Sequence, residues 1–155
     1  MDAHKAILGL DAEQAGVDYH LIDTNHNLLE RGWAAASHAG LAKLAAALSK
    51  HNLAWTDVLV GVEATGQWHL HWCEKLHNAG AKVYALNPLV AKRTAALPNA
   101  IRDNKTDPID AAGLAELVQR EHQRLGRFLY EPAGELFKLQ RLQNARQSVR
   151  ENSPT

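Results

Sequence analysis

Three strand patterns crowd into the first 35 residues, and the short spacing between them limits the folds that this chain can adopt. The segment "KAILGLD" (5–11) is almost wholly apolar, whereas "GVDYHLIDT" (16–24) alternates apolar and polar residues, the period of a half-buried strand. A third strand is predicted over 28–35, after a turn at "NHN" (25–27). Because connections of a few residues join antiparallel neighbours, these strands should form an antiparallel meander.

Helices and strands alternate in the rest of the chain. Ser37 is a typical N-cap before a helix whose apolar residues follow helical spacing. The apolar run "DVLVGVEAT" (57–65) predicts a central parallel strand, buried on both faces. The later patterns predict a helix at 66–80, a strand at 82–88, a short helix at 89–98 and a helix from Asp107 to about Glu121. This order predicts an α/β fold with a mixed sheet and flanking helices, in a ribonuclease H-like arrangement.

The stretch "KTDPIDAAGLAEL" (105–117) places two aspartates at the predicted start of that helix. Asp107 suits the N-cap, Pro108 the first helical position and Asp110 the third, where an acid favours the helix dipole. Taken alone, the stretch is an ordinary helix start. A metal-binding role for the two aspartates needs further acids from elsewhere in the chain.

Two such acids end predicted strands. Asp11 closes the first strand and Glu63 the fourth, and ligands of open α/β sheets bind at the carboxyl ends of strands. If these strands are neighbours, their acids emerge side by side, and Asp107 and Asp110 can approach the same place from one helical face. The four carboxylates would then stay ionised together only with cations to neutralise them.

The chemistry of such a cluster is specific. Mg²⁺ prefers carboxylate oxygens and keeps several waters, and two such ions about 4 Å apart hold the attacking and leaving oxygens of a phosphodiester. The acids therefore predict phosphoryl transfer on a nucleic acid, with Mg²⁺ as the cofactor and Mn²⁺ as a substitute.

Charge is distributed unevenly along the chain, although its net value is zero. Residues 1–81 contain 5 Lys or Arg against 9 Asp or Glu, whereas residues 82–155 contain 12 against 8. This asymmetry is typical of an acidic pocket beside a basic surface. The residues that we expect to contact nucleic acid flank the proposed site, and they are Lys92, Arg93, Arg102, Lys105 and Thr106.

Composition favours a single soluble domain. The 155 residues are 46% hydrophobic and 22% charged, and no apolar run approaches the length of about 18 residues that a membrane span needs. The N-terminus lacks the pattern of a signal peptide, and the single cysteine, Cys73, fits a reducing compartment. We therefore expect a cytoplasmic protein.

Four segments resemble, in order and spacing, the signature blocks of the DEDD transposases: "GLDAEQAGVDYHLID", "GVEATGQW", "ALNPLVAKR" and "RDNKTDPIDAAGLAEL". That group includes the Piv-type DNA invertase and RNA-guided recombinases of a bacterial insertion-sequence family. The resemblance covers about residues 6–122 and implies a RuvC-like nuclease fold. It also implies that Asp11, Glu63, Asp107 and Asp110 form the Mg²⁺-binding tetrad, with DNA and, in the RNA-guided members, a structured guide RNA as partners.

The same resemblance divides the chain into a catalytic domain at 1–125 and, at 126–155, a connector with the start of a coiled-coil helix. Leu136, Leu139 and Leu142 of that helix predict self-association into a homo-oligomer. Family members continue into a second domain that supplies a catalytic serine, and no serine here matches that position. We therefore expect the chain to be incomplete for strand exchange.

Two other function classes compete with this interpretation. An ATPase of the actin or sugar-kinase type shares the early strand order, but it needs a glycine-rich phosphate loop where this chain has only Gly16. A non-catalytic module for nucleic-acid binding and dimerisation would have lost its acids, and all four are present.

The segment 66–80 raises a last question, because His69, Cys73 and His77 are spaced by four. Successive steps of four drift around a helix and no second cluster supplies further ligands, so we interpret Cys73 as a core residue and not as a zinc ligand. Trp68 and Trp72 are interpreted as packing residues. Gly66 is expected to relieve the backbone at the turn after Glu63.

Overall fold

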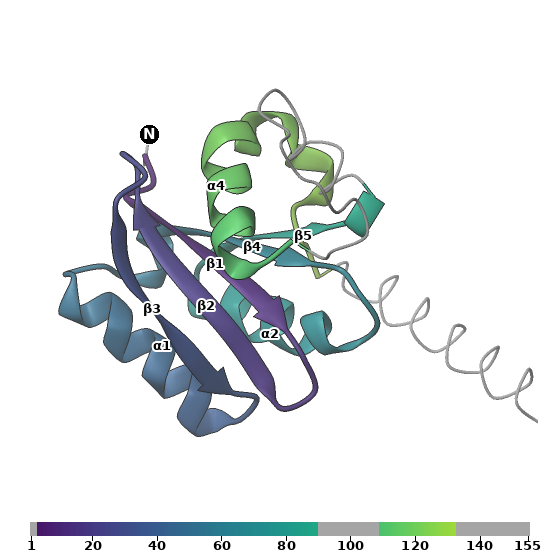
Figure 1. Cartoon of the computed structure of the whole chain (residues 1–155), viewed down its shortest axis with the longest axis horizontal. Coiled ribbons are helices and arrows are strands. Elements are labelled where there is room, and N and C mark those ends of the chain that lie inside the picture. Colours follow the sequence, from purple (N-terminus) through teal and green to yellow (C-terminus); the bar gives the residue numbers. More distant parts are fainter. Residues whose placement is uncertain (1–2, 90–108, 133–155) are drawn as a thin grey trace, which may run out of the picture.

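A five-stranded mixed sheet organises the protein, as a computed structural model that describes residues 3–89 and 109–132 shows (Figure 1). Its spatial order is β3-β2-β1-β4-β5. The strands are β1 (Ala6–Ala12), β2 (Gly16–Asp23), β3 (Leu28–Ala35), β4 (Val58–Glu63) and β5 (Lys82–Leu86). All five were predicted, with ends that differ by at most two residues.

The first three strands form the expected antiparallel meander, and β4 and β5 add to it in parallel. The β1–β2 turn is closed by the N–H of Glu13, which donates to the carbonyl of Gly16 at 2.8 Å. At the β2–β3 turn the Asp23 carboxylate accepts the backbone N–H groups of Asn25 and Asn27. Because β1 pairs with β4, Asp11 and Glu63 lie on adjacent strands, as the proposed site requires.

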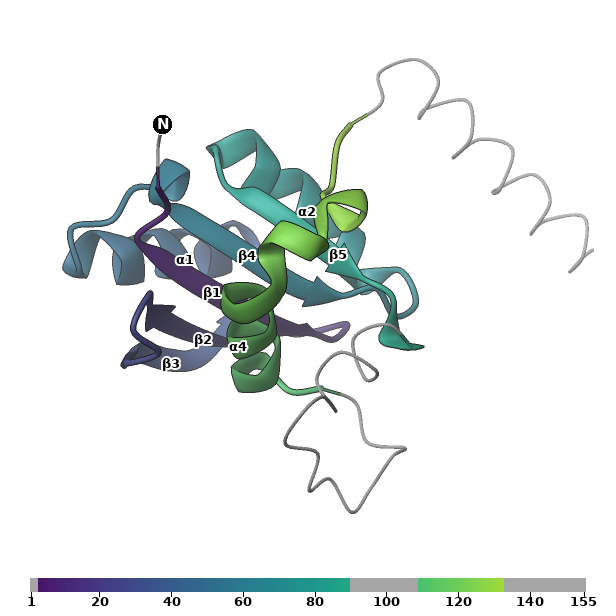
Figure 2. The same cartoon turned by 90° about the horizontal axis from the view of Figure 1, so that it is seen from above.

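Helices cover both faces of the sheet (Figures 1 and 2). The helices α1 (His38–Lys50) and α2 (Trp68–Ala79) lie on one face, and α4 (Ala111–Glu121) crosses the other. Ser37 caps α1 as predicted, since its hydroxyl accepts the N–H of Gly40 at 3.3 Å. Gly80 ends α2 in the left-handed region at φ 115°.

Successive side chains of each strand point to opposite faces of the sheet, so the protein has two separate hydrophobic cores. Leu8 and Leu10 of β1 point to the α1 and α2 side, where they pack with Trp72, whereas Ile7 packs against α4. Trp72 is 1% exposed, which confirms its packing role, but Trp68 is 39% exposed and is not a core residue.

The helices predicted at 89–98 and from about Ala133 lie outside the described residues, apart from Leu89 and its neighbour at the start of the first. Beyond α4 the chain makes two short 3-10 turns, η2 (His122–Arg124) and η3 (Gly126–Phe128). The N–H of Tyr130 then donates to the carbonyl of Val83 at 2.7 Å, so this segment lies along the edge strand β5. In the described part of the chain, no helix is both long and apolar enough to cross a membrane.

Candidate functional site

The strands β1 and β4 carry the same short pattern, a glycine followed two residues later by an acid. In β1 it is Gly9-Leu10-Asp11, and in β4 it is Gly61-Val62-Glu63. The parallel register pairs Gly9 with Gly61, so each acid lies two residues beyond its glycine at the carboxyl end of its strand. Because side chains alternate, both acids lie on the face that the glycines share, which is the face covered by α4.

The two glycines let α4 approach the sheet closely. A Cβ atom at Gly9 would lie 1.9 Å from the carbonyl oxygen of Ala111, and one at Gly61 would lie 2.5 Å from Cγ2 of Val118. Such contacts leave no room for any larger residue. The pair Gly9 and Gly61 is therefore a functional feature that the sequence analysis missed, although the repeated pattern of glycine and acid is visible in the sequence.

The start of α4 differs from the prediction. Asp110, and not Asp107, is the N-cap: its backbone is extended at φ −76° and ψ 175°, and its Oδ1 accepts the N–H of Gly113 at 2.7 Å. The N–H of Ile109 donates to Oε2 of Glu63 at 3.3 Å. Ile109 itself is fully buried, so tertiary contacts anchor the residue before the N-cap.

Glu63 and Asp110 are held in different ways. Glu63 is only 6% exposed and its Oε2 is bound by the backbone of the segment that leads into α4. Asp110 is exposed, and its capping hydrogen bond fixes one carboxylate oxygen. The hydrogen bond between Glu63 and Ile109 places Asp110, the next residue, at the same end of the sheet as Asp11.

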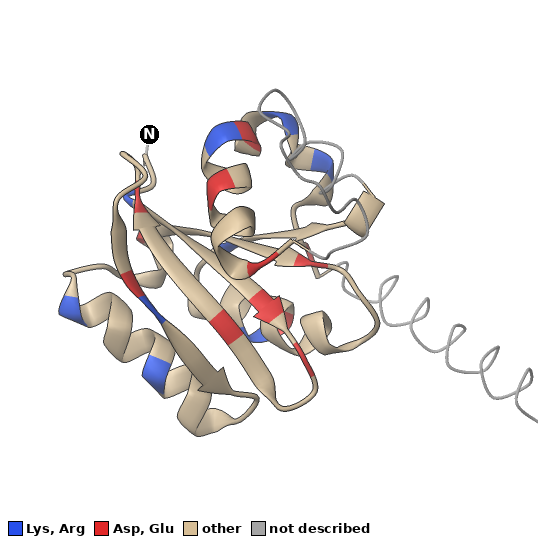
Figure 3. Cartoon of the chain, in the orientation of Figure 1, with Lys and Arg blue, Asp and Glu red and all other residues tan. Residues whose placement is uncertain are grey.

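The electrostatics of Asp11 show that these acids interact. Burial raises the pKa of Asp11 above its usual value of 3.8. The negative charges of four carboxylates raise this pKa further, and in decreasing order of effect they belong to Asp18, Glu13, Glu63 and Asp110. Figure 3 shows several acidic segments of the ribbon near the ends of the central strands and the start of α4.

Asp18 and Glu13 were not among the predicted site residues. Asp18 lies directly opposite Asp11 in the β1–β2 register, and Glu13 begins the turn between the two strands. The tight turn over residues 13–16 was a signal for this pairing, because a short hairpin connection determines which residues face each other. The acidic cluster is thus larger than the sequence analysis predicted.

The structure places three of the four predicted acids at this site, and Asp107 lies outside the described residues. The basic and polar candidates Lys92, Arg93, Arg102, Lys105 and Thr106 also lie outside them. Within residues 3–89 and 109–132, no three His, Cys, Asp or Glu side chains come close enough together to share a metal ion. The donors that gather at the site are all carboxylates, a set that suits Mg²⁺ or Mn²⁺.

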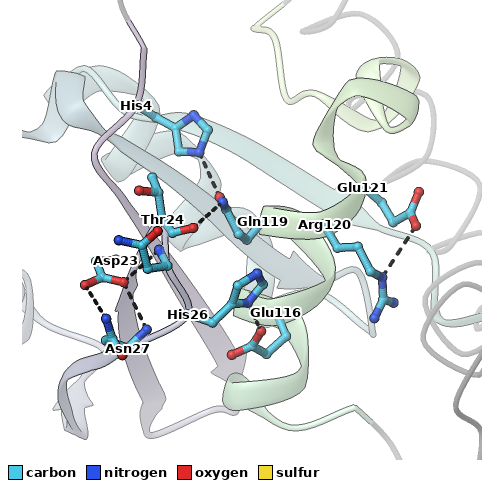
Figure 4. A network of polar contacts seen from close by, with 10 residues as sticks. His4, Asp23, Thr24, His26, Asn27, Glu116, Gln119, Arg120 and Glu121 are labelled. Carbon is cyan, nitrogen blue, oxygen red and sulfur yellow. Dashed lines mark hydrogen bonds and ion pairs between the residues drawn. The ribbon is translucent and has the colours of Figure 1, made fainter.

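A polar network anchors the far half of α4 (Figure 4). The side-chain amide of Gln119 donates to the carbonyl of Thr24 at 2.9 Å, and its Oε1 lies 2.8 Å from Nε2 of His4. One turn earlier, Glu116 forms an ion pair with His26 of the β2–β3 turn. Together with the two glycines, these contacts hold the axis of α4 and so the position of Asp110 at its first end.

The possible zinc ligands of α2 are not arranged as a metal site. His69 and Cys73 are buried, and burial raises the pKa of the Cys73 thiol to about 12. The described His, Cys, Asp and Glu side chains form no group of three that could hold a metal ion. His77 instead lies edge-on to Tyr130. Gly66 adopts φ +64°, which confirms its predicted role at the turn after Glu63.

Comparisons with known proteins agree with the observed architecture. A RuvC structure from Thermus thermophilus is 15% identical over 80% of this chain and 98% of its own, with a TM-score of 0.51. A second structure, T. thermophilus RuvC in complex with a Holliday junction substrate, is 15% identical over 78% of this chain and 96% of its own, with a TM-score of 0.48. The search of curated proteins finds no match. The first of these similarities shows the fold, which is RuvC-like as the sequence analysis predicted.

One family model extends over almost the whole chain. It is the model named DEDD_Tnp_IS110 and described as a transposase, and it matches residues 8–153. This range includes the glycine and acid pattern of both strands and the whole of α4. The chain belongs to the DEDD transposase family.

Proposed function

We propose that this protein provides a divalent-metal nuclease centre for DNA cleavage and strand transfer, with Asp11, Glu63, Asp107 and Asp110 as the metal-binding acids. Family membership and the RuvC-like fold support a nuclease or recombinase role. One observation carries the assignment of residues. Asp11 and Glu63 lie at the ends of neighbouring strands on the face that α4 covers, and Oε2 of Glu63 accepts the N–H of Ile109, the residue before Asp110.

Each acid has a distinct part in the proposed site. Glu63 is oriented by the N–H of Ile109, and Asp110 by its cap on Gly113. Asp11 carries an unfavourable negative charge beside like charges, which a cation would relieve. When bound, divalent ions would stabilise charge on the phosphodiester and lower the pKa of a water molecule.

Metal titration of the 155-residue chain tests the assignment. Isothermal calorimetry with Mn²⁺ and Mg²⁺ would compare the wild type with Glu63→Gln and Asp110→Asn. Glutamine keeps an oxygen to accept the Ile109 N–H, and asparagine is as good an N-cap as aspartate, so both variants should fold. We expect the wild type to bind and both variants to lose at least about tenfold in affinity, the scale of one charged ligand contact.

The exposed Glu74 of α2 supplies the matched control, because Glu74→Gln removes a carboxylate away from the acids. Equal loss of affinity in Glu74→Gln would mean that the metal binds the surface non-specifically. A folded wild type that ignores metal even with DNA present would reject the metal-site assignment. It would favour the non-catalytic binding module and leave Asp110 with its capping role alone.

We further propose that Lys92, Arg93, Arg102, Lys105 and Thr106 contact the phosphates of DNA or of a structured guide RNA. Their support is the basic balance of residues 82–155 and their position in sequence between β5 and α4. Lys92→Ala with Arg93→Ala should weaken binding to DNA and lower the slope of log affinity against log salt by about two, one for each phosphate contact. An unchanged slope would remove these two residues from the interface.

We make three further proposals of the same kind. The catalytic domain ends at residue 125, and a coiled-coil helix starts within 126–155. The chain self-associates through Leu136, Leu139 and Leu142. Their support is the resemblance to DEDD transposases, which also implies a serine from a further domain for strand exchange. We expect the 155-residue chain to bind metal and DNA without completing the exchange. Sedimentation that shows a clean monomer at high protein concentration would contradict self-association.

A further inference from the structure

A pocket lies at the opposite end of the sheet from the acids. Its volume is about 790 Å³, and it is bounded by the start of the chain, the amino ends of β4 and β5, and the turn η2. Three basic side chains line it, His4, Lys82 and His122, together with the hydroxyl-bearing Tyr84. Since Lys82 is the first residue of β5 and Glu63 the last of β4, the pocket and the acid cluster lie at different ends of the parallel strands.

The basic side chains in this pocket are crowded together. The rings of His4 and His122 meet edge-on, with 4.8 Å between their centroids. Burial lowers the pKa of His122, and the positive charges of His4 and Lys82 lower it further. None of the described residues that line the pocket is acidic. The pocket therefore gathers one lysine and two histidines, with no carboxylate among the described residues that line it.

The side-chain amide of Gln119 orients the ring of His4. The amide is anchored by its donation to the Thr24 carbonyl, which directs its Oε1 toward His4. An oxygen of this kind only accepts, so Nε2 of His4 donates to it, and Nδ1 is the ring nitrogen that remains for another partner (Figure 4).

We propose that this pocket binds a phosphate group of a nucleic acid strand through Lys82, His4 and His122. Phosphate offers the charge and the acceptor oxygens that three donors can share, and the pocket has room for a phosphodiester with its neighbouring sugars. Phosphate binding is inferred from the residues that line the pocket. Its assignment to nucleic acid rests on the proposed function and adds a contact at the end of the sheet remote from the cleavage site.

The test is a phosphate titration of the full 155-residue chain without divalent metal, followed by NMR of the histidine imidazoles. Chloride keeps the ionic strength constant. We expect saturable shifts of the His4 and His122 resonances, a rise of the His122 pKa, and no shift of His38, which begins α1, or of His51, which follows it. Lys82→Ala should weaken phosphate binding about tenfold, the factor of one charge-assisted hydrogen bond, and the matched variant Lys75→Ala on α2 should not.

Three results would each overturn the proposal. In the first, the histidine resonances do not shift saturably with phosphate; in the second, all histidines shift equally; in the third, Lys82→Ala binds phosphate with unchanged affinity. A DNA duplex then tests the source of the phosphate. If duplex shifts the His4 and His122 resonances in the wild type but not in Lys82→Ala, the phosphate belongs to nucleic acid. If only inorganic phosphate shifts them, the assignment to nucleic acid is overturned. Glu63→Gln should bind phosphate like the wild type, so failure here is distinguishable from failure of the metal site.

Discussion

Gly9 of β1 and Gly61 of β4 are paired across the sheet, and α4 occupies the space that their side chains would fill. Two residues beyond each glycine, on the same face, lie the acids Asp11 and Glu63. The close approach of the helix and the placement of the acids therefore have a common origin. A change at either glycine should affect both the stability of the protein and the geometry of the site.

Gly9→Ala should destabilise the protein by at least about 1–3 kcal/mol, the usual cost of overpacking, because the added Cβ meets backbone atoms that cannot rotate away. Urea unfolding measures the loss. Gly126→Ala is the matched control, since a Cβ there meets nothing within 4 Å. If the folded fraction of Gly9→Ala is titrated with Mn²⁺, we also expect weaker binding. Equal stabilities of the two variants would show that α4 does not rely on the glycine contact.

Asp18→Asn should increase the free energy of unfolding at neutral pH in the absence of metal. Asp18 faces Asp11 directly in the hairpin register, and its negative charge raises the pKa of Asp11. Removing a like charge from a directly opposed pair is worth about 0.2–1 kcal/mol. Chemical denaturation in chelator-treated buffer is the measurement, with Glu74→Gln as the comparison. A less stable Asp18→Asn would mean that the repulsion is already screened.

The Asp23 carboxylate should stabilise the protein in a pH-dependent manner. Hydrogen bonds from the backbone N–H of Asn27, then from its side chain and from Asn25, hold the pKa of Asp23 below its usual 3.8. A lowered folded-state pKa means that the stabilisation is complete above the unfolded-state pKa and is lost as the pH falls through the folded-state value. Asp23→Asn should thus be less stable at pH 7, and the difference should shrink below 3.8.

The measurement is the denaturant midpoint of the wild type and of Asp23→Asn between pH 7 and strongly acidic pH. The other titrating groups affect the stability of both proteins equally, so their effects cancel in the difference. Asparagine retains an oxygen for the turn, so the hairpin itself should persist. A difference between the two proteins that does not vary with pH would assign the effect to turn geometry and not to charge.

The Cys73 thiol should be almost inert in the folded protein. It is completely buried, and at a pKa of about 12 only roughly one thiol in ten thousand is ionised at pH 8. We expect negligible reaction with a coloured disulfide reagent under native conditions and complete reaction of one thiol in concentrated guanidinium chloride. Rapid native labelling would show that α2 opens readily from the sheet, which would contradict the packing seen around Trp72.

The local patterns were sufficient for most of the fold. The strands, the cap at Ser37 and the turn glycine Gly66 depend on residues close to one another in sequence, and all of them are found where predicted. The sequence left open whether the first and fourth strands are neighbours, and the structure pairs them, which brings Asp11 and Glu63 onto adjacent strands.

The sequence by itself determined the strands, most of the helices and the acids that end strands, since apolar period, capping chemistry and turn residues act over a few residues. Only the tertiary structure decided that the residue before α4 is anchored on Glu63, because the N–H of Ile109 donates to a carboxylate 46 positions away in the chain. It also decided that α4 rests on two glycines. Such contacts join residues remote in sequence, and their energies depend on how whole elements pack.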